Sequence, residues 1–283
     1  MNNNNKVFKT VMLLPVIIYS LCLIALPILY IFIISFFKSD SYGGIIRTFT
    51  LLNYLELFNW SYIKVFMQSI LIALITTFIC ILISYPFVLA ISHKSKRTQS
   101  VLMTLVMIPF LTNSLIRMYG WIVLLRKYGV INQVLMGLNI VDEPISLMYN
   151  NLGIIIGMVY TLIPFMILPL NSAVSTINKS LLEAASDLGA SKWETFKNII
   201  LPQSLPGLFN GALMVFTPAL GYFFIVDVLG GGKIMILGNL IKNQFLTARN
   251  WPLGASISVV IILITTLIIL VYRKLGGKME DLG

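Results

Sequence analysis

A carboxylate among aromatic side chains marks one place where this chain could bind a ligand. Asp227 lies a few residues after Tyr222 and Phe223, near the end of an otherwise apolar stretch. A carboxylate pairs with a positive charge, and the face of an aromatic ring attracts a cation within about 6 Å of its centroid. These residue types therefore suit an organic cation. An aspartate flanked by aromatic residues is also common where a membrane helix meets water, so an interfacial role is the alternative.

Arg117 is a second charged side chain inside an apolar stretch. An arginine at the centre of a membrane helix costs about 2.5–3.5 kcal/mol, so it is expected to face a cavity, a partner or the bundle interior. Two alternatives are open: a helix broken at Pro109 could lift Arg117 to the outer interface, or Arg117 could pair with Asp227. The residues placed on a candidate substrate pathway are Arg117, Tyr119, Tyr222, Phe223 and Asp227.

Other chemistries lack the residues that they need. The run Gly230–Lys233 reads GGGK, but it lacks the earlier glycine of a Walker A loop, and Ile234 stands where that loop has Ser or Thr. The single histidine, His93, lies in a basic connector, and Cys22 and Cys80 both lie inside apolar runs. No metalloprotease or serine-hydrolase motif is present. We therefore expect no catalytic residue, no metal site and no cofactor bound by this chain.

The composition is that of a membrane protein. The chain has 283 residues, of which 58% are hydrophobic and only 11% are charged, whereas soluble domains contain about 25% charged residues. Its formal net charge is +10, which in a soluble protein would suggest a nucleic-acid partner. Basic loops on the cytoplasmic side of a membrane explain the charge better. We expect contact with lipid and none with nucleic acid.

Six apolar stretches are long enough to cross a bilayer, since a spanning helix needs about 20 residues. Helices of this length satisfy their backbone hydrogen bonds internally, as lipid requires. The predicted spans are residues 11–37, 65–91, 101–125, 152–170, 205–229 and 253–272. The first has no signal-peptide cleavage motif and is expected to be retained. No soluble domain is indicated, so residues 1–283 are expected to form one all-α transmembrane domain.

Lysine and arginine residues orient these predicted helices. The short connector Lys94–Arg97 carries three basic residues, and such connectors lie on the cytoplasmic side. Although the bias over the whole chain is modest, this orientation places the N- and C-termini in the cytoplasm. It also places residues 171–204, the longest polar connector on that side, in the cytoplasm.

Residues 181–207 are polar and patterned. Leu181–Leu188 contains good helix formers without Pro or Gly, and Gly189 is the residue type that most readily ends a helix. Ser191 and Glu194 have the spacing of a capping box, which starts a second helix. The segment is therefore predicted to fold as a helix, a glycine turn and a second helix.

The second of these helices is predicted to be amphipathic. Trp193, Phe196 and Ile199 recur every three residues and fall on one apolar face. Pro202 and Pro206 either end this helix or begin the next element. A helix of this kind could bind another protein or lie flat in the lipid interface.

This segment resembles the cytoplasmic coupling loop, or EAA loop, of ATP-binding-cassette importer permeases. The resemblance rests on Glu183–Ala185, on Gly189, on Ile199 and on Leu201–Pro202 at the spacing of that family. In the family, a short helix of this loop docks in a cleft of a separate ATPase subunit and carries its motion into the membrane. The resemblance implies that the residues contacting the ATPase are Glu183, Ala184, Ala185, Asp187, Gly189, Ala190, Ser191, Trp193, Phe196, Leu201 and Pro202.

Further segments resemble the B-type permeases of spermidine/putrescine importers. They are residues 109–121, 160–170, 181–196 and 227–256. The resemblance implies the type I importer permease fold, with six transmembrane helices in a bacterial cell membrane. It also implies the partners: a homologous second permease, a dimer of ATPase subunits that bind ATP and Mg, and an extracellular polyamine-binding protein.

Two other functions are compatible with the sequence. Because the coupling loop does not depend on the cargo, the chain could be an importer permease for an amino acid, sulfate or iron. A secondary transporter driven by an ion gradient is the more distant alternative, since paired broken helices in inverted halves are not evident.

Overall fold

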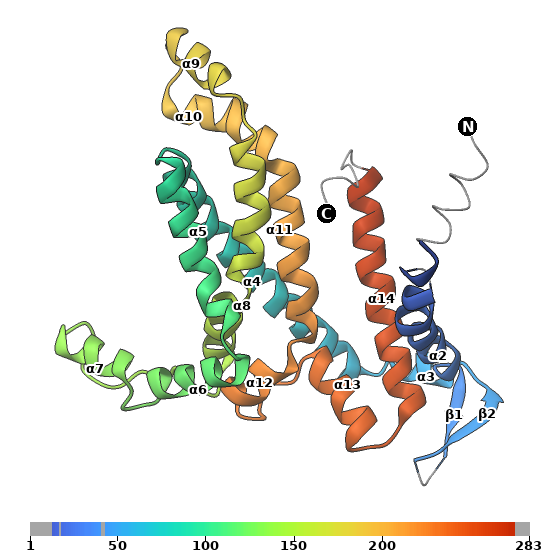
Figure 1. Ribbon diagram of the computed structural model, residues 1–283. Helices are drawn as coiled ribbons and strands as arrows, with labels where there is room; N and C mark the ends of the chain where they lie inside the picture. The colour runs from blue at the N-terminus through green and yellow to red at the C-terminus, as the bar shows by residue number, and fades with distance from the viewer. Residues whose placement is uncertain (1–12, 17, 41–42, 275–283) are drawn as a thin grey trace, which may run out of the picture. The chain divides into compact units, whose positions relative to one another are not determined.

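The structure is a computed structural model that describes residues 13–16, 18–40 and 43–274 (Figure 1). It contains two compact units, and each is described by itself. The first comprises Met1–Ile63 and Leu240–Leu267, and the second comprises Lys64–Asn239 and Ile268–Gly283. The expected start of the first span at residue 11 and both chain termini, which we expected in the cytoplasm, lie outside the described residues.

The first unit contains an apolar helix followed by a β-hairpin. Its elements are the π-helix η1 (Leu21–Ala25), α2 (Leu26–Ile34), β1 (Phe37–Ser39), β2 (Ile45–Phe49), α3 (Leu52–Glu56), most of α13 (Leu237–Leu246) and most of α14 (Trp251–Lys274). β1 and β2 pair antiparallel. The buried Asn53 joins α3 to the hairpin, because its Nδ2 donates to the carbonyl oxygens of Ser35 and Phe37, each at 2.8 Å. None of the predicted site residues lies in this unit.

The second unit is built from helices and holds all of the predicted site residues. Its helices are most of α4 (Trp60–Ser92), α5 (Lys96–Leu111), α6 (Ser114–Leu125), α7 (Val130–Gly137), α8 (Asn151–Ser175), α9 (Lys179–Asp187), α10 (Lys192–Thr195), the π-helix η2 (Phe196–Ile200), α11 (Leu201–Gly221) and α12 (Phe223–Gly230). The fully buried side chains Met158, Leu162 and Met166 place its core along α8.

α8 and α11 pack side by side along much of their length (Figure 1). The glycines of α11 allow this contact. A Cβ atom on Gly207 would lie 2.5 Å from both the Cβ of Ala173 and the carbonyl oxygen of Pro169, and one on Gly211 would lie 2.7 Å from the Sδ of Met166. Small residues let the backbones of membrane helices approach closely. This pair of helices forms the axis of the unit.

Five helices within the described residues are long and apolar enough to cross a membrane: Leu13–Ile34, Trp60–Ser92, Asn151–Ser175, Lys192–Gly221 and Trp251–Tyr272. A sixth span results if α5 and the bent segment after it count as one. The fold class expected from the sequence, an all-α membrane protein with about six spans, is confirmed. Four expected spans match these helices closely, whereas the third and the fifth differ.

The third expected span, residues 101–125, is two helices rather than one. α5 ends at Leu111, and the segment that follows is bent from it by 94°. Asn113 starts α6, because its side-chain oxygen accepts a hydrogen bond of 2.8 Å from the backbone N–H of Leu115. This cap explains why the break follows Leu111 and not Pro109, which lies inside α5.

The fifth expected span, residues 205–229, is displaced towards the N-terminus. The helix that starts with α10 continues without a break to Gly221, and Pro202 lies in the first turn of α11. The chain turns at Tyr222, and α12 follows as a separate helix. A Cβ atom on Gly238 would lie 2.2 Å from the carbonyl oxygen of Gly221. The close approach of this later segment therefore accompanies the break.

The basic connector and the segment resembling a coupling loop lie at the same end of the second unit. Lys94–Arg97 joins α4 to α5, and Figure 1 shows this end of α5 near α9 and α10. Phe196 and Met103 both pack against the cluster that contains Val88 of α4. This arrangement agrees with the charge argument, which placed both segments on one side of the membrane.

Candidate functional site

The segment between α8 and α11 contains the predicted glycine turn. Gly189 has φ +78°, a conformation that strains residues with a side chain. Its N–H donates to the carbonyl oxygen of Ser186, and the N–H of Ala190 donates to that of Ala185, both at 2.9 Å. These two bonds form a Schellman motif, which satisfies the last carbonyl groups of α9.

The predicted capping box is also present at the start of α10. The side-chain oxygen of Ser191 accepts a hydrogen bond of 3.3 Å from the N–H of Glu194. In return, the Oε2 atom of Glu194 accepts from the backbone N–H of Ser191 at 2.7 Å. The orientation of α10 relative to the turn is therefore set by local bonds.

Large apolar side chains are exposed on this otherwise polar segment. Leu188 is 88% exposed and Trp193 is 68% exposed, while Ala185 is buried. Exposed apolar side chains rimmed by polar ones mark surfaces that bind a partner or lipid.

The residues assigned to ATPase contact divide into two groups. The exposed group is Glu183, Ala184, Asp187, Gly189, Ser191, Trp193 and Pro202. Ala185 is buried, and Ala190 is half-buried. Phe196 and Leu201 are half-buried because they pack against the core cluster that contains Tyr85 and Leu170. The segment thus has an exposed outer surface and an inner face that packs against α4 and α8.

The residues assigned to a substrate pathway lie at the other end of the second unit. Arg117 and Tyr119 belong to α6, whereas Tyr222, Phe223 and Asp227 lie at or within α12. α6 and α12 pack against each other and against α8. Figure 1 shows both short helices at the end of α8 remote from α9 and α10. The fold therefore brings together two parts of the chain that are about a hundred residues apart in the sequence.

Asp227 is exposed on α12 and is held by a residue that the sequence analysis missed. Asn239 is only 4% exposed, and its Nδ2 donates to Oδ1 of Asp227 at 2.6 Å and to the carbonyl oxygen of Phe223 at 3.2 Å. Its own Oδ1 accepts from the N–H of Ile236 at 3.2 Å. An asparagine in an apolar run was the available signal. Asn239 orients the carboxylate on α12.

Arg117 folds back across the break between α5 and α6. Its guanidinium carbon lies 5.9 Å from the centroid of the Phe110 ring, which is cation–π range. Phe110 in turn meets Phe165 of α8 edge-on, with centroids 5.2 Å apart. The Nε atom of Arg117 is buried without a hydrogen-bond partner in the structure. Arg117 thus connects the start of α6 to the end of α5.

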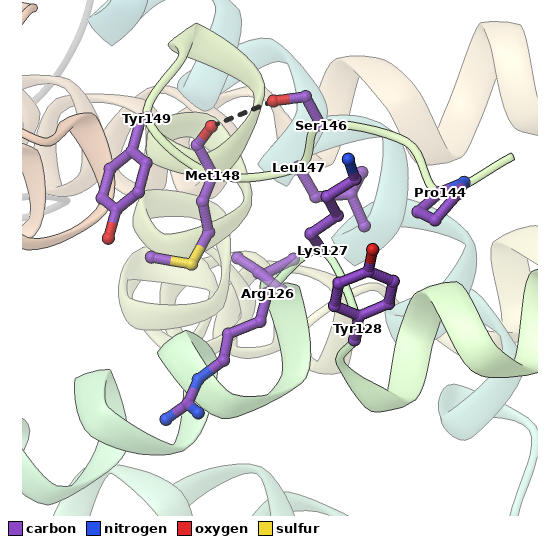
Figure 2. Close-up of a pocket in the computed structure, with 9 residues that line it drawn as sticks. Arg126, Lys127, Tyr128, Pro144, Ser146, Leu147, Met148 and Tyr149 are labelled. Atoms are coloured by element: carbon purple, nitrogen blue, oxygen red, sulfur yellow. Dashed lines mark hydrogen bonds between the residues drawn. The ribbon is translucent and has the colours of Figure 1, made fainter.

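A cavity of about 680 Å³ lies beside α6, where the sequence analysis placed no site (Figure 2). It is lined by Leu125, Arg126, Lys127, Tyr128, Pro144, Ser146, Leu147, Met148 and Tyr149. The Nζ atom of Lys127 lies 5.9 Å from the centroid of the Tyr128 ring. The lining residues include two cations and no carboxylate, so the cavity repels a cationic ligand.

Among the described residues, no group of three or more His, Cys, Asp or Glu side chains is arranged to hold a metal ion. The candidate sites are the segment from α9 to α10 at one end of the second unit and the short helices α6 and α12 at the other.

Comparison with known proteins identifies related chains. The family profile described as "Binding-protein-dependent transport system inner membrane component" matches residues 83–281. The chain is 39% identical, over the whole of both sequences, to the spermidine/putrescine transport system permease protein PotB of Salmonella typhimurium strain SL1344. It is 40% identical to the protein of the same name from Escherichia coli strain K12, over 95% of this chain and 99% of that protein.

A solved structure shares the fold at low sequence identity. It is a bacterial alginate ABC transporter in complex with an alginate pentasaccharide-bound periplasmic protein. One chain of that structure aligns with a TM-score of 0.78 and 16% identity, covering 96% of each chain.

Proposed function

Because this chain belongs to the family of binding-protein-dependent transport system inner membrane components, we propose that it is the permease subunit of an ATP-driven importer of polyamines. The chain is a multi-pass protein of the bacterial inner membrane and a non-catalytic component of its transporter. The similarity over its whole length to permeases named for spermidine and putrescine carries the choice of substrate. Of the functions considered, a permease for another solute is the nearest alternative.

The segment from α9 to α10 is the proposed docking surface for an ATPase subunit. The segment lies beyond the ends of α8 and α11 (Figure 1), and its Leu188 and Trp193 are exposed, as expected of a surface that enters a cleft of a partner. The Schellman motif and the capping box give it a defined shape before docking. The partner would bind ATP and Mg, and this chain would bind no cofactor.

The proposed cargo pathway includes α12 and α6. A polyamine is a flexible chain of methylene groups with several ammonium groups, so it needs carboxylates for its charges and apolar surfaces for its methylenes. Asp227 supplies a carboxylate that Asn239 orients. Tyr222 and Phe223 supply aromatic surface at the start of the same helix, and Tyr119 supplies it on α6, which packs against α12. Of these rings, those of Tyr119 and Phe223 are exposed.

Arg117 is proposed to shape the pathway rather than to bind the cargo. Two like charges 4 Å apart repel by about 4 kcal/mol at the effective dielectric constant near a protein surface. A guanidinium group in contact with an ammonium group would therefore weaken polyamine binding. Its position over Phe110 supports a role in holding the bend between α5 and α6.

The remaining partners complete the proposed transporter. A homologous second permease would form the other half of the pathway, two ATPase subunits would bind the cytoplasmic surface, and an extracellular binding protein would deliver the polyamine. ATP binding would bring the ATPase subunits together and move the docked α9–α10 segments. Hydrolysis would return the permeases to the inward-facing state. Such a cycle requires that the transporter has two conformations and that ATP binds to one of them more tightly than to the other.

Transport of radiolabelled spermidine and putrescine tests this proposal. Cells lacking their own importer would express this chain with its neighbouring subunits, and the control would carry an inactive ATPase. We expect uptake that requires the active ATPase and exceeds uptake of labelled sulfate. If the assembled complex imports sulfate and no polyamine, the substrate assignment is wrong, and if polyamine uptake continues with the inactive ATPase, the coupling assignment is wrong.

A further inference from the structure

We infer that Tyr85 and Ser204 form the mechanical link through which movement of the α9–α10 segment reaches α4 and α11. The inference rests on the proposed function, because it describes how coupling continues inside the permease. Neither residue lies near the proposed cargo pathway, and both are positioning residues.

A row of aromatic rings connects the exposed segment to this pair. Trp193, on the outer surface of α10, stacks on Phe196 with centroids 5.5 Å apart and an interplanar angle of 25°. Phe196 then meets Tyr85 of α4 edge-on, with centroids 5.4 Å apart and an angle of 77°. Rigid rings in contact transmit a displacement better than flexible side chains because their packing offers few alternative positions.

A buried hydrogen bond continues this row into α11. The hydroxyl groups of Tyr85 and Ser204 are hydrogen-bonded to each other. The Oγ atom of Ser204 also donates to the carbonyl oxygen of Leu201 at 3.1 Å, which uses its only hydrogen, so Tyr85 is the donor and Ser204 the acceptor. Ser204 is fully buried, and Tyr85 is nearly so. Breaking this bond would leave a buried hydroxyl group without a partner.

The link joins both helices at places where their backbones lack hydrogen bonds. Pro86, next to Tyr85, lies inside α4, and Pro202 and Pro206 lie two residues on either side of Ser204. Each proline removes one backbone donor from its helix, which favours bending there. Both helices therefore lack backbone hydrogen bonds close to the link.

The π-helix η2 is a third place, besides the prolines of α4 and α11, where the helical backbone can change its conformation. It spans Phe196–Ile200, between α10 and α11, and the N–H of Leu201 donates to the carbonyl oxygen of Phe196 across five residues. Single π-turns of this kind interrupt α-helices frequently at functional sites. A displacement of α10 would thus reach α11 by two routes, through the softened η2 backbone and through the ring of Phe196 on Tyr85. The second route reaches α4 directly, at Tyr85.

The test measures how many polyamine molecules the complex imports for each ATP that it hydrolyses. The variants are Tyr85→Phe, which keeps the ring on Phe196, Ser204→Ala, and the double variant. Each would be assembled with the partner subunits in proteoliposomes, with spermidine-loaded binding protein. We expect each single variant to lower the import-to-hydrolysis ratio about fivefold, the equivalent of the roughly 1 kcal/mol that one hydrogen bond contributes. The double variant should lower the ratio no further than either single variant, because both changes remove the same hydrogen bond.

Three further variants separate a link from a merely structural contact. Thr77→Val is the matched control, since Thr77 is also buried on α4 but donates to Ala73 of its own helix at 2.7 Å. It should leave the ratio unchanged. Ser204→Thr keeps the acceptor and should retain most of the ratio. Phe196→Leu keeps an apolar anchor but removes the ring, and it should lower the ratio even if Tyr85→Phe fails to assemble.

The outcomes discriminate between the link and the function on which it rests. Unchanged ratios in Tyr85→Phe, Ser204→Ala and Phe196→Leu would overturn the inference. So would a fall in import and hydrolysis together, in proportion to the amount of assembled complex, because that is the result of a structural defect. An unaltered wild-type complex that shows no ATP-dependent spermidine import would instead count against the proposed function.

Discussion

Asn239 donates a hydrogen bond of 2.6 Å to the carboxylate of Asp227, and this bond orients the one acidic side chain of α12. The same nitrogen donates to Phe223, so Asn239 holds the carboxylate and the first turn of α12 together. The carboxylate thereby gains a defined position while its side chain stays exposed. An oriented carboxylate beside aromatic rings is suited to an incoming cation.

Replacing Asp227 with Asn should weaken polyamine uptake without affecting assembly with the ATPase. The change removes the negative charge and keeps an oxygen that can accept from Asn239. A hydrogen bond to a charged group contributes about 1.5–3 kcal/mol, so the KM for uptake should rise by roughly one to two orders of magnitude. Asp142→Asn, which removes an exposed charge from the loop between α7 and α8, is the control. Unchanged uptake kinetics would make Asp227 an interfacial residue only.

Replacing Gly189 with Val should uncouple transport from ATP hydrolysis. A Cβ atom at this position would meet no atom within 4 Å, so the cost is conformational, about 1–2 kcal/mol for a residue with a side chain at positive φ. The turn should shift and misplace α10. Uptake and co-purification of the ATPase measure the effect. Gly189→Asn is the matched control, because asparagine tolerates this conformation, and equal uptake by both variants would contradict the prediction.

Replacing Gly207 with Ala should destabilise the contact between α8 and α11. The added Cβ would lie 2.5 Å from the Pro169 carbonyl oxygen, and such overpacking typically costs about 1–3 kcal/mol. Thermal unfolding of the purified protein in detergent should occur at a lower temperature. Gly120→Ala in α6, where the new methyl group meets nothing within 4 Å, should leave it unchanged or raise it. Similar unfolding temperatures for the two variants would contradict the prediction, because α8 and α11 would then accommodate the added methyl group without cost.

Replacing Arg117 with Met should have the same effect on uptake as replacing Phe110 with Leu. If the guanidinium group holds the bend through the Phe110 ring, either change removes a contact of about 0.5–2 kcal/mol, and the double variant should be no worse. Arg117→Lys keeps a cation and should retain most of the uptake. A higher KM in Arg117→Met alone, with normal kinetics in Phe110→Leu, would instead place Arg117 in contact with the cargo.

Much of the segment from α9 to α10, which is the candidate coupling segment, could be predicted because its hydrogen bonds are local. The capping box joins Ser191 to Glu194, and the Schellman motif around Gly189 joins residues no more than five positions apart. Such patterns depend on residue types at short spacing, which a sequence displays directly. Four of the six predicted spans could likewise be recognised as long apolar helices, since a bilayer requires such helices whatever their neighbours are.

The sequence by itself thus determined the membrane class, most of the long apolar helices and the local shape of the segment from α9 to α10. Only the tertiary structure decided where the third and fifth expected spans break. The third breaks after Leu111, where the side chain of Asn113 starts a new helix that is bent by 94° from α5, and the fifth breaks at Tyr222, where Gly238 approaches the carbonyl group of Gly221. The tertiary structure likewise decided the partners of Asp227 and Tyr85, which lie 12 residues away at Asn239 and 119 residues away at Ser204. Hydrogen bonds over such separations depend on how helices pack, and hydropathy and residue spacing do not record that packing.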